Sequence, residues 1–232
     1  MLYISMKTAV IMVLWTENGN YDWSKYSIPL VRKYLPSEKL VIVDNNKNPD
    51  ELEFVRKHTS IILPGDRGNS HGQGIDIAVK WCRENDIDIL VHIEPDCDFT
   101  SSLWFDSLVQ PIVNGDAWMT GGVRMGQGYT HICPTAWLVS EIKHTFGLVG
   151  RGDDIYRPAY QKLIDVKSLV RGIDPDVVDP HVIWFYLYIW DTGIKNWFDI
   201  AAQGKAKLVP IPGITHHWLG RKSSPRNLLL LL

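Results

Sequence analysis

Residues 87–99 read IDILVHIEPDCDF, and this stretch decides the fold that the sequence predicts. The run 87–93 is almost entirely apolar, and its length fits a buried strand. Pro95 then ends the run, because proline cannot donate a hydrogen bond to a sheet. Asp96 and Asp98 follow one residue apart, at the carboxyl end of the strand, where α/β enzymes bind their ligands. The pattern predicts either a ligand site at a strand end or an acidic surface turn.

Short apolar segments alternate with segments of helical periodicity through the first half of the chain. Strands are predicted at 8–15, 40–43, 60–63 and 87–93, with helices between them near 26–34, 48–55 and 75–82. This short cycle indicates βαβ units and a largely parallel sheet. We therefore expect an α/β fold: a single domain, residues 1–227, with a mostly parallel central sheet flanked by helices.

The second half of the chain is less regular. The predicted elements are a helix capped by Ser101 or Ser102, a strand at 117–123, a helix at 135–146, a helix from Thr192 to Gly204, a strand at 207–211 and a loop at 215–218. The aromatic run 182–190 (VIWFYLYIW) must be buried or face a ligand.

Composition places the chain among globular proteins and excludes some partners. Of 232 residues, 45% are hydrophobic and 22% are charged, and the net charge of −2 gives no general attraction to nucleic acid or anionic membranes. Three cysteines without a paired spacing argue against a disulfide framework and favour a reducing, cytoplasmic setting. No apolar run is long enough to cross a membrane. The leucine tail, 228–232, is a frayed end, a docking segment or a peripheral membrane contact.

The loop 65–74 (GDRGNSHGQG) contains four glycines before a predicted helix. It matches neither the P-loop nor the GxGxxG pattern, which disfavours P-loop enzymes and nicotinamide dehydrogenases. It is either a flexible surface connection or a loop that lets a nucleotide approach the backbone beside a helix N-terminus. In the second case, Asp66 and Gly72 are nucleotide-binding candidates.

Several side chains are suited to binding a divalent metal or moving a proton. If the chain is extended, Asp96 and Asp98 face the same way, and their oxygens suit Mg²⁺ or Mn²⁺ beside a diphosphate. His216 and His217 are adjacent, so they are either a solvated pair or a source of one further ligand. Asp191 precedes a helix, where a capping role is favoured on sequence grounds alone.

The order of these motifs resembles the A-type glycosyltransferases, in particular the family 2-like inverting enzymes that use nucleotide sugars. The motifs that carry the resemblance, within about 8–223, are Asp44-Asn45-Asn46, the glycine-rich loop, Asp96-Cys97-Asp98, Trp190-Asp191-Thr192-Gly193 and His216-His217-Trp218-Leu219-Gly220. The resemblance implies a nucleotide-diphospho-sugar transferase fold and metal-assisted transfer of a sugar to an acceptor hydroxyl. It also implies a nucleotide-binding half, about 1–100, and an acceptor-binding half, about 101–227.

The resemblance further assigns roles to individual residues. Thr16 and Asp44 would hold the base and ribose, and Asp96 would lie near the ribose and the metal. Asp98 would bind Mn²⁺ or Mg²⁺, His216 would add a ligand or contact the diphosphate, and Asp191 would be the general base. The acceptor would be a glycan, a lipid-linked group or another hydroxyl compound.

The sequence departs from the family pattern at three points. Lys47 replaces a small hydroxyl residue, the Asp191 segment lacks paired acids, and the Gln-x-x-Arg-Trp motif of processive synthases is absent. Two alternatives stay open. A sugar nucleotidyltransferase would carry an arginine in a glycine-rich loop after the first strand, whereas residues 16–20 contain none. A carbohydrate-binding module would explain the ten tryptophans, but it would need neither the acidic pair nor a nucleotide.

Overall fold

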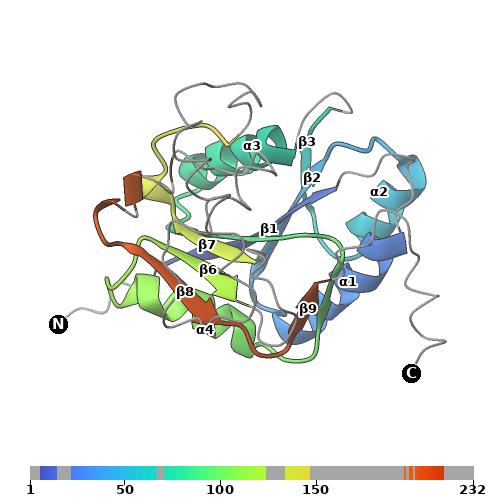
Figure 1. Cartoon of the computed structure of the whole chain (residues 1–232). Coiled ribbons are helices and arrows are strands. Elements are labelled where there is room, and N and C mark those ends of the chain that lie inside the picture. The colour runs from blue at the N-terminus through green and yellow to red at the C-terminus, as the bar shows by residue number, and fades with distance from the viewer. Residues whose placement is uncertain are drawn as a thin grey trace, which may run out of the picture.

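The central sheet contains seven strands, and most neighbouring strands run parallel (Figure 1). The computed structural model describes residues 6–14, 22–66, 71–123, 134–146, 196, 199–200 and 202–216, and the structural statements below concern these residues. The strands of the sheet are β1 (Thr8–Leu14), β2 (Lys39–Asp44), β3 (Ile61–Pro64), β4 (Ile89–Ile93), β6 (Met119–Val123), β7 (Thr135–Leu138) and β8 (Ala206–Pro210). Their order is β3-β2-β1-β4-β7-β6-β8, and β7 runs antiparallel to both of its neighbours.

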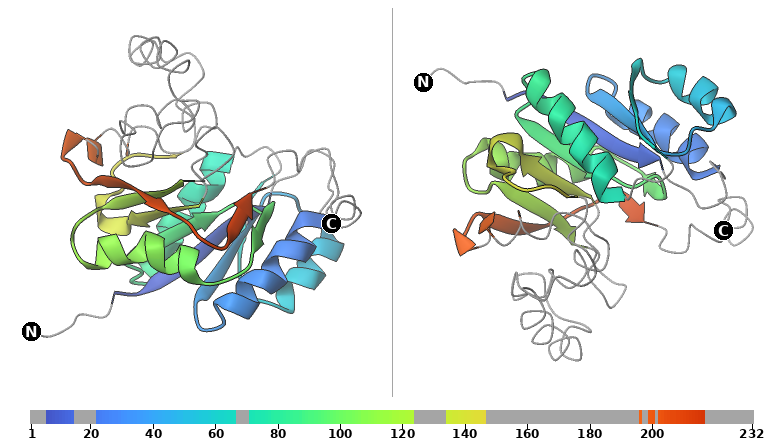
Figure 2. Two further views of the ribbon diagram at one scale, coloured as in Figure 1. Left: turned by 60° about the horizontal axis from the view of Figure 1, so that its bottom comes forward. Right: turned by 90° about the horizontal axis from the view of Figure 1, so that it is seen from above.

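Helices cover both faces of this sheet, as the alternation of strands and helices predicts (Figure 2). They are α1 (Asp22–Tyr34), α2 (Pro49–Arg56), α3 (His71–Glu84), α4 (Leu103–Val113) and a short 3₁₀ helix, η1 (Val139–Glu141). The predicted fold class, one α/β domain with a mostly parallel sheet between helices, is confirmed. None of the helices in the described ranges is both long enough and apolar enough to cross a bilayer.

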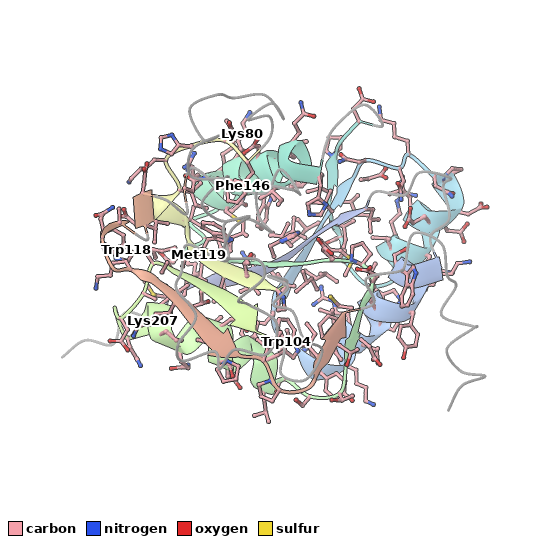
Figure 3. The ribbon with its side chains drawn as sticks, viewed as in Figure 1. Lys80, Trp104, Trp118, Met119, Phe146 and Lys207 are labelled. Atoms are coloured by element: carbon pink, nitrogen blue, oxygen red, sulfur yellow. The ribbon has the colours of Figure 1, made fainter. Side chains whose placement is uncertain are left out.

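Strand β1 divides the core into two halves because its side chains alternate between the faces of the sheet. Ile11 and Val13 pack with α3 on one face, whereas Met12 and Leu14 pack with α1 and α4 on the other. All four side chains are buried, which explains why the strand reads as a continuous apolar run. Figure 3 labels one residue from each half of the core: Phe146 beside α3, and Trp104 on α4.

Two predicted elements of the second half are wrong. The segment 135–146 is not one helix: Thr135–Leu138 is β7, inserted between β4 and β6, and only Val139–Glu141 makes a helical turn. Hydrogen bonds to two neighbouring strands outweigh the helical spacing of the apolar residues here. The predicted loop at 215–218 begins inside a strand, β9 (Ile214–His216), and residues 217 and 218 lie outside the described ranges.

A second, two-stranded sheet lies beside α1. It consists of β5 (Cys97–Phe99) and β9, paired antiparallel, with Cys97 opposite His216 and Asp98 opposite Thr215. Figure 1 shows β9 close to α1, which packs against β5. We call this sheet the β5–β9 ribbon. The sequence did not predict it, because both strands have only three residues.

Candidate active site

The parallel strands β1 to β4 end at one edge of the sheet, here called the carboxyl edge. Asp44 ends β2, Asp66 follows β3, Gly72 is the second residue of α3, and Asp96 lies in the turn after β4. Four of the predicted ligand-binding residues therefore belong to segments that meet at this edge. In α/β sheets this is the edge at which ligands bind.

The loop after β2, residues 44–47, is held at the carboxyl edge by a set of backbone contacts. The Lys47 amide donates to Oδ1 of Asp44 over 2.8 Å, and the Asn45 amide donates to the Leu14 carbonyl over 3.1 Å. On the other side, the Gly65 amide donates to the Asp44 carbonyl over 3.0 Å. Asp44 is 6% exposed, so its carboxylate is held by its own loop before any ligand binds.

Glycines bring the loop after β3 and the start of α3 close to this loop. A Cβ on Gly65 would lie 2.0 Å from Oδ1 of Asn45, and a Cβ on Gly74 would lie 2.5 Å from Cγ1 of Val13. Neither position has room for a side chain. These two glycines of the loop 65–74 are therefore needed for close packing, which neither interpretation of that loop predicts.

Asp66 lies on the surface of the carboxyl edge. Its carboxylate is 3.2 Å from the Nζ atom of Lys47, and both side chains are more than half exposed. An exposed pair of this kind contributes little stability, about 0–1 kcal/mol. It does link the loops that follow β2 and β3.

A buried carboxylate that the sequence did not single out lies directly behind the loop 44–47. Glu51, in the first turn of α2, is 1% exposed. Oε1 accepts from the Ser24 hydroxyl over 2.6 Å, and Oε2 accepts from Nδ2 of Asn46 over 2.8 Å. Burial is the main cause that raises the pKa of Glu51, and the nearby Asp44 raises it further, while the two hydrogen bonds lower it.

The two acids of the Asp96-Cys97-Asp98 motif occupy different kinds of backbone. Asp96 lies in the turn after β4, whereas Asp98 lies within β5. The expected common direction of the two side chains assumed an extended chain, and the turn removes that basis. Asp98 lies within hydrogen-bonding reach of the hydroxyl of Tyr26 on α1. The pKa of Tyr26 is raised, first by burial and then by the charge and hydrogen bond of Asp98.

The β5–β9 ribbon brings the backbone of His216 opposite Cys97. The turn before β9 fits closely against the start of α4: the Thr100 amide donates to the Gly213 carbonyl over 2.8 Å. Gly213 has φ +79°, and a Cβ there would lie 2.1 Å from Oγ of Ser101. Within the described residues, no three histidine, cysteine or acidic side chains gather as a metal site, and the side chain of His216 is outside that description.

Two histidines also meet at the carboxyl edge. The Nε2 atoms of His71, at the start of α3, and His92, buried on β4, are 2.9 Å apart. At this distance one ring donates its proton and the other accepts it, so both Nε2 atoms cannot be protonated together. Sequence gave no signal for this pair, because the residues lie on different elements.

Two predicted site residues are not placed by the structure. Thr16, expected at the nucleotide, and Asp191, expected as the general base, both lie outside the described ranges. The same holds for His217 and for the aromatic run 182–190. The described part of the site is thus the carboxyl edge of β1 to β4 together with the β5–β9 ribbon.

Comparison with known proteins gives matches in structure but not in sequence. No protein-family model matches the chain, and no curated protein matches it. A cytidylyltransferase from Leptospira borgpetersenii serovar Hardjo-bovis superposes with a TM-score of 0.54 at 12% identity, over 90% of this chain and 77% of that one. Glucosyl-3-phosphoglycerate synthase from Mycobacterium tuberculosis, in complex with Mn²⁺, UDP-glucose and phosphoglyceric acid, gives 0.52 at 12% identity, over 92% and 72%.

The same synthase in complex with phosphoglyceric acid alone gives a TM-score of 0.50 at 12% identity, over 97% of this chain and 75% of that one. Similarity at this level of identity establishes a shared fold alone. Proteins of this fold include both a cytidylyltransferase and a glucosyl-3-phosphoglycerate synthase. Function must therefore be argued from the site.

Proposed function

We propose that this protein is a glycosyltransferase that moves a sugar from a nucleotide-diphosphate sugar to an acceptor hydroxyl. One observation carries the proposal: the β5–β9 ribbon pairs Cys97 of the acidic motif with His216, from the far end of the chain. The acids and the histidine were singled out from the sequence as parts of one diphosphate and metal site. Their backbones are neighbours beside the carboxyl edge, where such a site is needed.

The nucleotide would lie along the carboxyl edge. Asp44, preset by the Lys47 amide, is suited to hold hydroxyl or amide donors of a nucleoside, and Thr16 would act beside it. Asp66 and Gly72 would border the nucleotide where the loop 65–74 meets α3. Asp96, in the turn after β4, would lie between the ribose and the diphosphate.

The residues that would hold a divalent cation are Asp98, Asp96 and His216. Carboxylate oxygens are the ligands that Mn²⁺ and Mg²⁺ prefer, so the two acids fit such an ion. When bound, the cation would offset negative charge on the departing diphosphate. The hydrogen bond from Tyr26 to Asp98 would hold that carboxylate in place.

The reaction proposed is a direct displacement. The acceptor oxygen forms a bond to the anomeric carbon as the bond from that carbon to the diphosphate oxygen breaks. Asp191 would take the proton of the acceptor hydroxyl, as a general base does. Attack opposite the leaving group would invert the anomeric configuration.

The acceptor is proposed to be a glycan, a lipid-linked group or another hydroxyl compound, bound by the half of the chain after residue 100. The synthase with the same fold was crystallised with a small phosphorylated acid, phosphoglyceric acid, which makes small hydroxyl acids reasonable first probes. The proposed setting is cytoplasmic. Three cysteines without a paired spacing in the sequence support a reducing compartment.

Sugar nucleotidyl transfer is the second candidate, because a cytidylyltransferase shares the fold. The absence of an arginine in residues 16–20 counts against it. The two reactions release different products: glycosyl transfer releases a nucleoside diphosphate, whereas nucleotidyl transfer releases pyrophosphate. A product assay therefore separates them directly.

The first test is a thermal-shift panel of UDP, CDP, GDP and ADP and their glucose conjugates, each with and without Mn²⁺. Ligands that bind the native state raise the melting temperature, so the panel should identify the nucleobase that the protein binds. We expect stabilisation by one nucleoside diphosphate, stronger with Mn²⁺, followed by transfer from the matching nucleotide sugar. A carbohydrate-binding module would ignore all of these nucleotides, and that result would overturn the proposal.

A further inference from the structure

The first turns of α1 touch both parts of the candidate site. Ser24 and Tyr26 are two residues apart, and side chains at that spacing point about 200° apart around a helix. Ser24 is buried and faces α2, where it donates to Glu51. Tyr26 is partly exposed and lies on the helix that packs against β5, with its hydroxyl within hydrogen-bonding reach of Asp98. One short piece of helix therefore reaches the loop after β2 and the β5–β9 ribbon at the same time.

On the α2 side, Glu51 connects this helix to the loop 44–47. Each of its oxygens has a different partner: Ser24 on α1, and Asn46 in the loop. Asp44 and Asn45 are also held by contacts with backbone groups of Leu14, Lys47 and Gly65. Glu51 therefore ties this loop to a helix through a side chain.

A charged group at this position does not serve stability alone. Glu51 is almost fully buried beside Asp44, and burying an ionised carboxylate beside another acid is unfavourable. Groups that reduce stability in this way are found where function requires a fixed arrangement. Here the group fixed by Glu51 is the loop that carries Asp44.

On the ribbon side, Tyr26 is the corresponding contact. Its hydroxyl meets Asp98 inside β5, the strand whose register with β9 sets the position of residue 216. The Tyr26 ring also packs edge-to-face against Trp23, with centroids 6.4 Å apart, and Trp23 is buried. The ring of Tyr26 is thus held against a buried residue of its own helix.

We propose that α1 sets the distance between the nucleoside-binding and diphosphate-binding parts of the site, with Glu51 and Tyr26 as positioning residues. Glu51, through Ser24, fixes the loop of Asp44, and Tyr26 fixes Asp98. The inference rests on the proposed function and deepens it. It adds two residues that contact no substrate atom in the proposed mechanism. Glu51 affects binding of the nucleoside, and Tyr26 affects binding of the diphosphate.

The test uses calorimetry to measure two affinities separately, that of the nucleoside and that of its diphosphate. The nucleobase is the one that the thermal-shift panel identifies. Tyr26→Phe removes only the hydroxyl. We expect its affinity for the nucleoside diphosphate with Mn²⁺ to fall roughly three- to tenfold, the size of one hydrogen bond, with nucleoside affinity unchanged. Tyr34→Phe, at the other end of α1, is the matched control and should change neither affinity.

Substitution of Glu51 should show a different pattern. Glu51→Ala should weaken the nucleoside and its diphosphate by the same factor, because the loop of Asp44 contacts their shared part. Glu51→Gln can still accept from Asn46 and can donate to the Ser24 oxygen, so it should restore most of that affinity. Glu53→Gln, an exposed position on the same helix, is the matched control. If Glu51→Ala does not fold, Ser24→Ala tests the same link with a smaller change.

The possible outcomes are distinct. Folded Tyr26 and Glu51 variants with wild-type affinities would overturn this inference and leave the proposed function standing. An equal loss of nucleoside and diphosphate affinity in Tyr26→Phe would also overturn it, because a general loss of structure has that effect. Failure of the wild-type protein to bind any nucleotide would instead overturn the proposed function itself.

Discussion

Asn196 and His144 exchange two hydrogen bonds although they lie far apart in the sequence. The His144 amide donates to Oδ1 of Asn196 over 2.7 Å, and Nδ2 of Asn196 donates to the His144 carbonyl over 2.7 Å. Oδ1 also accepts from the Lys143 amide over 2.8 Å, and Asn196 is 1% exposed. One buried amide side chain therefore satisfies three backbone groups of the segment after β7.

Asn196→Ala should destabilise the protein substantially. It leaves three partly buried backbone groups without this partner, and an unsatisfied group costs up to about 1–3 kcal/mol when buried. Urea denaturation followed by fluorescence would measure the loss. The control is Gln203→Ala, which removes an exposed side chain bonded to a single carbonyl and should change stability by less than about 0.5 kcal/mol. Equal effects of the two substitutions would contradict this account.

Glu51 should make stability depend on pH in a defined direction. Its pKa is raised in the folded protein, so the folded state holds this proton more tightly than the unfolded chain does. The free energy of unfolding should therefore fall as pH rises from the ordinary glutamate pKa through the raised value. Glu51→Gln should remove this fall, and the variant should gain stability relative to wild type as pH rises. The measurement is urea denaturation across pH 4 to 8, with Glu53→Gln as control, and parallel pH profiles for wild type and Glu51→Gln would refute the expectation.

Asp98→Asn should abolish metal-dependent nucleotide binding with little loss of fold. The asparagine carbonyl can still accept from Tyr26, so the contact between α1 and β5 is retained while the carboxylate is lost. Calorimetry with the nucleoside diphosphate and Mn²⁺ would test this, and circular dichroism would confirm folding. Asp106→Asn, an exposed acid on α4, is the control. An unchanged Mn²⁺-dependent affinity would remove Asp98 from the proposed metal ligands.

Asp191→Asn separates the capping and general-base roles of that residue. Asparagine caps a helix about as well as aspartate, but it cannot accept the acceptor proton at neutral pH. We expect near-native stability, retained nucleotide-sugar binding and a fall in transfer rate of about 10²–10⁴-fold. Transfer at close to the wild-type rate would mean that the base lies elsewhere. Asp153 and Asp154 are then the next candidates to substitute.

Sequence predicted the first half of the fold well because the signals there are local. The run at 8–15 is apolar on both faces of β1, and the helix predicted near 48–55 is α2, which Asn48 caps by accepting from the Asp50 and Glu51 amides. The periodicity at 75–82 matches the buried face of α3. Each of these features is decided by residues within one or two turns of chain.

The sequence could not predict features that depend on distant partners. The apolar spacing at 135–146 fits a helix, but Thr135 to Leu138 pair with strands on both sides. Glu51 follows Asp50 in a normal acidic first turn, and its burial follows from Ser24, 27 residues earlier. Nothing in the local sequence marks Tyr26 as the partner of Asp98.

The pairing of β5 with β9 has a consequence for the order in which the protein folds. Strands β1 to β4 are joined by short βαβ connections, so they can form as soon as the first hundred residues leave the ribosome. The ribbon must wait, because β9 is synthesised only after the long stretch between residues 97 and 216. Contacts between such distant residues also close slowly, since a large loop must be ordered. The nascent chain is therefore expected to form the strands that carry Asp44 first, and to gain the partner strand of Asp98 only after residue 216 has been synthesised.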